Sequence, residues 1–99
     1  MNTAIAAIDL TIESITATND CFYQGKSDEG YKRLQPCLTN IMVALNTLTQ
    51  QNITFDNDGF NVALSEALTA MEQKDVTLMA DILQYDIIEK LEEIKASLI

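Results

Sequence analysis

The stretch VTLMADILQYDIIEKLEEIKASL, Val76 to Leu98, decides the fold of this 99-residue chain. Its N-terminal half carries apolar side chains on most sides of a predicted helix, whereas its C-terminal half narrows to a single apolar stripe between charged residues. A helix that is apolar nearly all round is buried nearly all round. We therefore predict that the first half of this helix lies at the centre of the protein or is covered by a second subunit.

Two helices at the start of the chain show apolar residues at alternating steps of three and four. The first seam has a polar residue, Asn19, at a position where it could set the register between helices. Gly25 and Ser27 predict a helix end followed by a new N-cap, so the two seams form an antiparallel hairpin. The seams consist of Ile5, Ile8, Ile12, Ile15, Asn19 and Phe22, and of Tyr31, Leu34, Leu38, Ile41, Leu45 and Leu48.

Pro36 lies inside the second seam, where a proline removes one helical hydrogen bond. Either the helix bends at Pro36, or regular helix begins near Gln35 after an irregular turn. We favour the bend, because the apolar seam continues through Pro36 without losing its phase.

A third, shorter helix follows the longest connection, Asn52 to Phe60, and its expected core residues are Phe60, Leu64, Leu68 and Met71. Lys74 and Asp75 then predict a helix end and a new cap, with one bent helix as the alternative. The complete pattern predicts an all-α protein: an antiparallel four-helix bundle of up-down hairpins, in a single domain of residues 1–99.

The charge balance excludes several classes of function. The chain has 15 acidic and six basic residues, a formal net charge of −9, and such a surface repels nucleic acid and anionic lipid. No apolar run approaches the ~20 residues of a membrane span, and the N-terminus lacks the features of a secretory signal. We therefore predict a cytoplasmic protein that binds neither nucleic acid nor membrane, while a basic partner or a metal cation remains electrostatically possible.

Neither the two cysteines nor the histidine content points to catalysis. The chain has no histidine, the commonest general base and metal ligand. Cys21 and Cys37 are offset by roughly 10 Å along the expected hairpin, beyond the reach of a disulfide. We expect both to be structural thiols, in keeping with a reducing compartment.

The stretch TFDNDGFN, Thr54 to Asn61, is similar to a calcium-binding loop. If Gly59 takes the sixth position of such a loop, the first and twelfth positions fall on Thr54 and Ser65, which are not the required acidic ligands. A helix start explains the same residues better, with Asp56 as the N-cap and Phe55 and Phe60 as a hydrophobic staple. We therefore expect no metal site here.

The remaining candidates for function gather on the last helix. Asp81 lies among apolar neighbours, where a carboxylate needs a hydrogen-bond donor. The simplest interpretation is a hydrogen bond to a nearby helix or a loop, or a position on an exposed strip; the alternative is a contact with a ligand or partner. We predict a non-catalytic protein-interaction module or chaperone-like adaptor, without cofactor or metal, that self-associates as a homodimer through the apolar start of this helix. The predicted partner-binding residues are Met79, Asp81, Ile82, Tyr85 and Asp86, with Tyr23 and Tyr31 beside the hairpin turn.

The alternative is a small ligand-binding or enzymatic bundle that uses Asp81, Tyr85 and Asp86 in a polar pocket. The two hypotheses differ in where these side chains lie: an interaction surface leaves them open to a partner, whereas a catalytic site gathers them around a cavity.

The segment ALTAMEQKDVTLMADILQYDIIEKLEEI, Ala67 to Ile94, resembles a pattern in small uncharacterised helical proteins of clostridia and their relatives. In that pattern a Lys–Asp turn leads into an aliphatic helix; the matching residues are Lys74, Asp75, Met79, Ala80, Asp81, Ile82, Leu83, Tyr85 and Asp86. The upstream FYQGKSDEGYKRL also resembles the helix–turn–helix segment of that group. The resemblance implies a helical fold and no established activity. A second likeness, to the flagellin export chaperones, implies a bundle that holds a client helix in apolar grooves.

Overall fold

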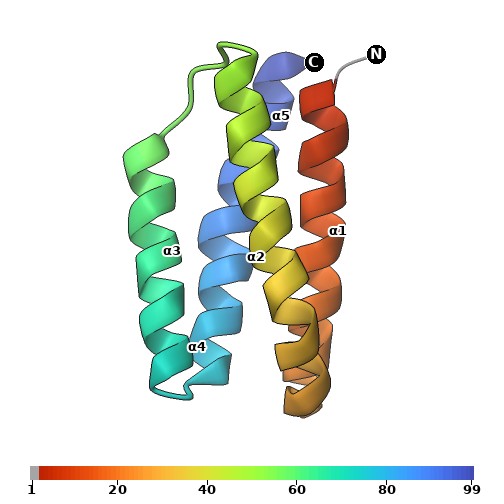
Figure 1. The fold of residues 1–99 in the computed structure, drawn as a ribbon, viewed down its shortest axis with the longest axis vertical. Helices are drawn as coiled ribbons and strands as arrows, with labels where there is room; N and C mark the ends of the chain where they lie inside the picture. Colours follow the sequence, from red (N-terminus) through yellow and green to blue (C-terminus); the bar gives the residue numbers. More distant parts are fainter. Residues whose placement is uncertain (1–2) are drawn as a thin grey trace.

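The computed structural model describes residues 3–99, and all the regular structure in that range is helical. Consecutive rods run antiparallel (Figure 1), so the predicted all-α up-down bundle with a shorter third helix is confirmed. The last rod consists of three consecutive segments of one continuous helix. The elements are α1 (Thr3–Tyr23), α2 (Ser27–Gln50), α3 (Asn57–Glu72), α4 (Val76–Asp81), the π-helical segment η1 (Ile82–Ile88) and α5 (Glu89–Leu98).

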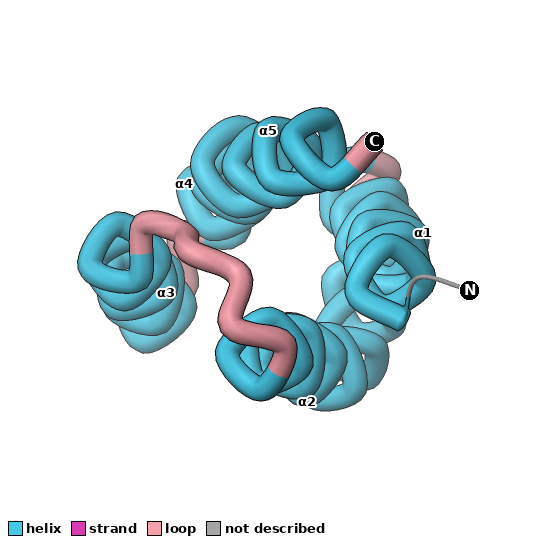
Figure 2. Tube along the Cα trace, turned by 90° about the horizontal axis from the view of Figure 1, so that it is seen from above, coloured by secondary structure: helices cyan, strands magenta, loops and turns pink. Residues whose placement is uncertain are grey.

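The α4–η1–α5 rod lies between its two neighbours. It packs along α1 on one side, and its α4 and η1 segments pack on α3 on the other side. Helix α2 packs closely along α1, whereas the loop that joins α2 to α3 spans a wider separation, as the view from above shows (Figure 2). The prediction that the apolar start of the last helix is central is therefore confirmed, and α1 and α3 of the same chain cover it.

The η1 segment explains how a stretch that is apolar on most sides fits into one core. Its buried residues form two pairs, Ile82 with Leu83 and Ile87 with Ile88, and the pairs are five positions apart. In an α-helix, five residues turn through about 500°, which would leave the pairs roughly 140° apart around the axis. A π turn closes its hydrogen bonds over five residues, so the two pairs lie nearly above one another. The wider turn thus directs both pairs to the same core.

Helix α3 turns a different side to the core from the one the sequence suggested. Its buried stripe is Phe60, Ala63, Ala67 and Ala70, whereas Leu64 and Met71 are only partly buried and Leu68 is exposed. The expected Leu64–Leu68–Met71 seam was therefore wrong at Leu68, whereas Leu64 and Met71 pack against the core while partly buried. Alanine has the smallest side chain beyond glycine, and a stripe of alanines lets α3 approach α4 and η1 closely. Leu68 and Met71 lie beside the stripe, on the flank of α3 that faces α2.

The predicted helix-end residues other than Ser27 act as expected, and Lys74 takes a positive φ of 59° after the end of α3. Gly25 takes a positive φ of 77° after α1, and the carboxylates of Asp56 and Asp75 accept the N–H groups of Gly59 and Leu78. The predicted cap at Ser27 was wrong. Helical hydrogen bonding already begins one residue earlier, where the carbonyl of Lys26 accepts the N–H of Gly30 at 2.9 Å.

Helix α2 continues through Pro36 without a break, so the interpretation that a helix begins near Gln35 was wrong. Pro36 lies on the exposed side of α2. Its missing N–H deprives the carbonyl of Lys32 of its helical donor, and that carbonyl belongs to a residue at the surface, where water replaces the bond. The ion pairs within residues 3–99 are Lys90–Asp56 and Lys95–Asp9.

The stretch that resembled a calcium loop is a helix start. Asp56 accepts the Gly59 N–H at 3.0 Å and an ammonium hydrogen of Lys90 at 3.2 Å, and the Phe55 and Phe60 rings meet edge to face at 5.8 Å. The hydrophobic staple and the N-cap predicted for this stretch are therefore confirmed. The Gly59 N–H, and after it the hydrogen bond from Lys90, hold the pKa of the Asp56 carboxyl below its ordinary value.

Replacement of Asp56 by alanine is expected to lower the melting temperature at pH 7, because the N-cap bond and the Lys90 pair are both lost. A carboxyl with a depressed pKa stabilises the fold above its unfolded-state pKa, and this contribution disappears as the pH falls. The difference in melting temperature between the variant and the wild type should therefore be constant above about pH 4 and shrink as the pH falls below it. Thermal denaturation followed by circular dichroism between pH 3 and pH 7 measures this difference. Asp58→Ala, in the same turn but without a cap bond, should change the melting temperature less; a pH-independent difference for Asp56→Ala would contradict the prediction.

Candidate functional site

Tyr23 and Asp81 form a hydrogen-bonded pair across the seam between α1 and the last rod. Tyr23 is the last residue of α1, Asp81 is the last residue of α4, and the Tyr23 hydroxyl donates to Asp81 Oδ1 at 2.7 Å. Burial, then the hydrogen bond to Asp81, then the charge of Asp81, and lastly Tyr85, raise the pKa of Tyr23 to about 12. The simplest prediction for Asp81, a hydrogen bond to another helix, is therefore confirmed.

Tyr85 completes this group, which we call the tyrosine cluster: Tyr23, Asp81 and Tyr85. The π turn that buries the two apolar pairs of η1 leaves Tyr85 between them, on the outer side of the rod, with 60% of its surface exposed. Tyr85 follows Asp81 by four positions along the same rod, and it is the smallest of the causes that raise the pKa of Tyr23. The cluster thus consists of the hydrogen-bonded Tyr23–Asp81 pair and a second exposed tyrosine on the rod that carries Asp81.

Asn19 lies beneath the tyrosine cluster and joins the same two elements. Its side chain is 1% exposed, and its Nδ2 group donates to the carbonyl of Ala80 at 3.1 Å and to Gln84 Oε1 at 3.5 Å. The amide oxygen of Asn19 has no hydrogen-bond partner in the structure. Ala80 is the residue before Asp81, so these hydrogen bonds fix the position of α1 along the last rod close to the tyrosine cluster.

The structure separates the other predicted site residues from the tyrosine cluster. Met79 and Ile82 are 1% and 7% exposed, so they belong to the core and are not available to a partner. Asp86 is exposed but lies on the α3 side of the rod, where it lines a shallow depression with Val62 and Glu66. The polar pocket of the alternative hypothesis, which would combine Asp81, Tyr85 and Asp86, is therefore not assembled.

Tyr31 packs at the hairpin turn instead of joining the tyrosine cluster. Its ring meets that of Phe22 edge to face, with centroids 5.3 Å apart. Phe22 also lies across Gly30, so closely that a β-carbon on Gly30 would come within 2.6 Å of the ring. Tyr31 therefore acts with Phe22 and Gly30 in closing the end of the α1–α2 hairpin.

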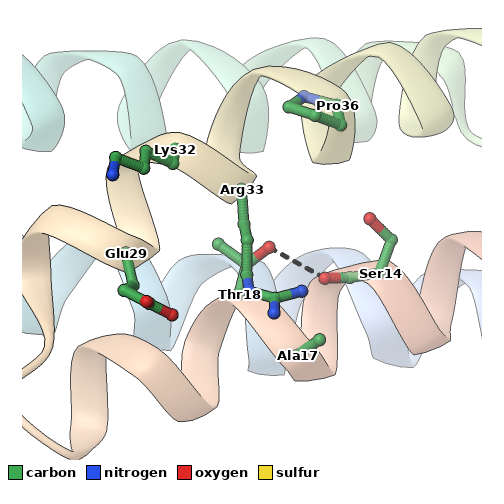
Figure 3. Close-up of a pocket in the computed structure, with 7 residues that line it drawn as sticks. All are labelled: Ser14, Ala17, Thr18, Glu29, Lys32, Arg33 and Pro36. Carbon is green, nitrogen blue, oxygen red and sulfur yellow. Dashed lines mark hydrogen bonds between the residues drawn. The ribbon is translucent and has the colours of Figure 1, made fainter.

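A pocket of about 350 Å³ between α1 and α2 was not foreseen from the sequence. The Arg33 side chain reaches from α2 across to Thr18 and Ala17 of α1, while Lys32, Glu29 and Pro36 complete the α2 wall (Figure 3). The Thr18 hydroxyl is occupied, because it donates to the carbonyl of Ser14 at 2.8 Å. The signal in the sequence was the neighbouring pair of basic residues in an acidic chain.

Cys37 lies beside this pocket but is not a reactive thiol. It is fully buried, and burial raises the pKa of its thiol, although hydrogen bonds with Thr18 and Ser14 act in the opposite direction. A thiol with a raised pKa carries little of the nucleophilic thiolate at neutral pH. Cys21 and Cys37 are both free, so the prediction that they form no disulfide is confirmed.

The flanks of α2 and α3 that face each other form a narrow apolar crevice. It is lined by Leu34 and Leu38 of α2, by Ala67, Leu68 and Met71 of α3, and at its base by Met79 and Leu83. The crevice contains no space large enough for a water molecule, because its own side chains fill it. A client helix of the kind that the export-chaperone likeness implies therefore has no open groove here.

The comparisons with known proteins identify one related family. Residues 1–97 match the family model described as a domain of unknown function, DUF8042. No curated protein and no solved structure matches the chain. Within residues 3–99, no helix is long and apolar enough to cross a membrane, and no group of three or more Cys, Asp or Glu residues is arranged to hold a metal ion.

Proposed function

The chain belongs to the DUF8042 family, a domain of unknown function, so a proposed role has to be argued from its own surface residues. We propose that it is a non-catalytic adaptor that binds a basic segment of a partner polypeptide. The tyrosine cluster, Tyr23, Asp81 and Tyr85, is the contact site. The observation that carries the proposal is the hydrogen bond that Asp81 accepts from Tyr23, with Tyr23 and Tyr85 both exposed, at 51% and 60%.

The chemistry of the tyrosine cluster matches a lysine or arginine side chain. The carboxylate of Asp81 attracts a cation by its charge, and the face of an exposed tyrosine ring attracts a cation by about 0.5–2 kcal/mol. Tyrosine also contributes much of the binding energy of protein interfaces, because it adds a large contact area at a small loss of side-chain entropy.

The charge distribution supports the same kind of partner. Residues 56–99 contain ten of the 15 acidic residues and only three of the six basic ones, so the α3–α5 half of the bundle carries most of the negative charge. Asp81 and Tyr85 belong to that half. An acidic surface draws a basic segment toward it and raises the association rate. We place this interaction in the cytoplasm, in keeping with the free thiols of Cys21 and Cys37.

The test uses a basic amphipathic peptide, a helical 14-residue chain of lysine and leucine, with a glutamate–leucine peptide as the opposite-charge control. Isothermal titration should show binding of the basic peptide only. Tyr85→Ala should weaken this binding about tenfold, the equivalent of about 1.4 kcal/mol.

Asp81→Asn and Asp86→Asn form a charge-matched pair for the same titration. Both variants remove one negative charge from the last rod, but only Asp81 belongs to the tyrosine cluster. Asp81→Asn should weaken the basic peptide about tenfold, whereas Asp86→Asn should change its affinity less than twofold. Equal effects of the two changes would show unspecific attraction to an acidic protein and would refute the proposed site.

A further inference from the structure

The outward side of the α1–α2 hairpin is a second surface, distinct from the tyrosine cluster. Ser14, Ala17 and Pro36 line one pocket there, and close by the Thr11 hydroxyl donates to the carbonyl of Asn40 at 3.1 Å. On α1, Leu10 lies four residues before Ser14, and on α2, Val43 lies three residues after Asn40. Residues three and four apart share one side of a helix, so these two exposed apolar side chains belong to the same surface. We call this surface the hairpin face: Leu10, Ser14 and Ala17 on α1, and Pro36, Asn40 and Val43 on α2.

The hairpin face differs from the rest of the surface in its charge. Residues 34–55, which include most of α2 and the loop after it, contain no charged residue. Leu10 and Val43 are 57% and 54% exposed. The charged residues that line the pocket on this face are one acid, Glu29, and two bases, Lys32 and Arg33, so the negative charge of the chain is not concentrated there. The centre of a protein interface is typically poor in charged residues, its rim is polar, and arginine is enriched at interfaces. The hairpin face has the same composition.

We infer that the occupant of the hairpin face is a second copy of this chain, bound face to face about a two-fold axis. Each copy carries a net charge of −9, so the two repel each other in most orientations. Contact through residues 56–99 would bring the acidic halves together. Contact through the hairpin face joins the uncharged surfaces and leaves both acidic halves, with their tyrosine clusters, directed into solvent.

The dimensions of the face fit a stable pairing. The longest extent of the molecule is 37 Å, and two adjacent helices span about 20 Å across. The contact area available is therefore about 700 Å² on each copy, close to the roughly 800 Å² per partner of a standard interface. The apolar start of the last helix, the dimer surface that the sequence suggested, is occupied within the chain by α1 and α3.

Sedimentation equilibrium of the full chain tests this dimer, with Val43→Glu and Val62→Glu as matched variants. Both valines are exposed on helices, at 54% and 57%, but Val62 lies on α3 against the acidic half. The wild type should be a dimer at about 100 µM, with a dissociation constant that falls as added salt screens the repulsion between copies. Val43→Glu should raise that constant at least a hundredfold, because the two-fold axis places two carboxylates in the contact. Val62→Glu should remain a dimer.

Leu10→Glu provides the same test from α1 if Val43→Glu does not fold, as judged by circular dichroism. A wild type that stays monomeric at about 100 µM overturns the inference, as does a dimer that both Val43→Glu and Leu10→Glu leave intact. A dimer that only Val62→Glu dissociates assigns the interface to α3 and also overturns it. None of these measurements uses the basic peptide, so their outcome is independent of the proposed function.

Discussion

Replacement of Phe60 by alanine is expected to lower the free energy of unfolding by about 3–5 kcal/mol. Phe60 is fully buried near the start of α3, and its ring packs edge to face on Phe55. The truncation removes a large apolar group from the core and leaves a cavity, because the flanking alanines of α3 are too small to fill it. Chemical denaturation followed by circular dichroism, with the slope held equal to that of the wild type, measures the loss.

Phe55→Ala is the matched control for Phe60→Ala. The two rings form one aromatic pair, but Phe55 is only partly buried and precedes the N-cap of α3. Its loss removes the staple contact and less buried area, so we expect a change of about 1–2 kcal/mol. If Phe55→Ala lowered the free energy of unfolding as much as Phe60→Ala, the loss would come from the staple contact that both rings share and not from the buried position of Phe60.

The second large effect is expected for Asn19→Asp, a change of nearly identical shape that places a carboxyl at a buried position. The introduced oxygen would face the Ala80 carbonyl, which now accepts a hydrogen bond from the Asn19 amide. An unpaired buried charge costs about 3–5 kcal/mol, so the variant should be strongly destabilised at pH 7. Burial raises the pKa of the introduced carboxyl above its unfolded value of about 3.9.

The pH dependence distinguishes this cause from a simple packing defect. With a raised folded-state pKa, the penalty is absent below about pH 4, grows as the pH rises through the interval between the two pKa values, and is constant above it. The difference in unfolding free energy between Asn19→Asp and the wild type should therefore shrink at acid pH. Asn46→Asp, at an exposed position of α2, should change stability by about 0.5 kcal/mol or less at every pH. A penalty for Asn19→Asp that does not vary with pH would contradict the electrostatic explanation.

The tyrosine cluster could be predicted only in part. All three residues were predicted from the sequence: Asp81 and Tyr85 because they lie on the apolar last helix, and Tyr23 because it borders the hairpin turn. Their assembly could not be predicted, since Tyr23 and Asp81 are 58 positions apart and meet only when α1 packs on the last rod. The same packing places Asp86 on the α3 side of the rod, so the polar pocket of the alternative hypothesis is not formed.

The π segment accounts for the residues that the sequence assigned to the wrong environment. With a period of 3.6, the pairs at Ile82 and Ile87 would point in different directions, so the segment looked apolar on most sides and suggested a partner subunit. The five-residue spacing of a π turn directs both pairs to one core within the chain. Met79 and Ile82 are therefore core residues, which is why we propose the hairpin face as the surface for self-association.

By itself, the sequence determined the number of helices and most of their ends. The Asp56 and Asp75 caps, the Phe55–Phe60 staple and the turn at Gly25 depend on backbone geometry and on neighbours no more than five positions away, so the order of the residues is sufficient. The tertiary structure alone decided which stripe of α3 is buried, where the π turn lies, and which side chains form the tyrosine cluster. Those outcomes depend on how closely two distant helices approach, and that distance is set jointly by the side chains of both.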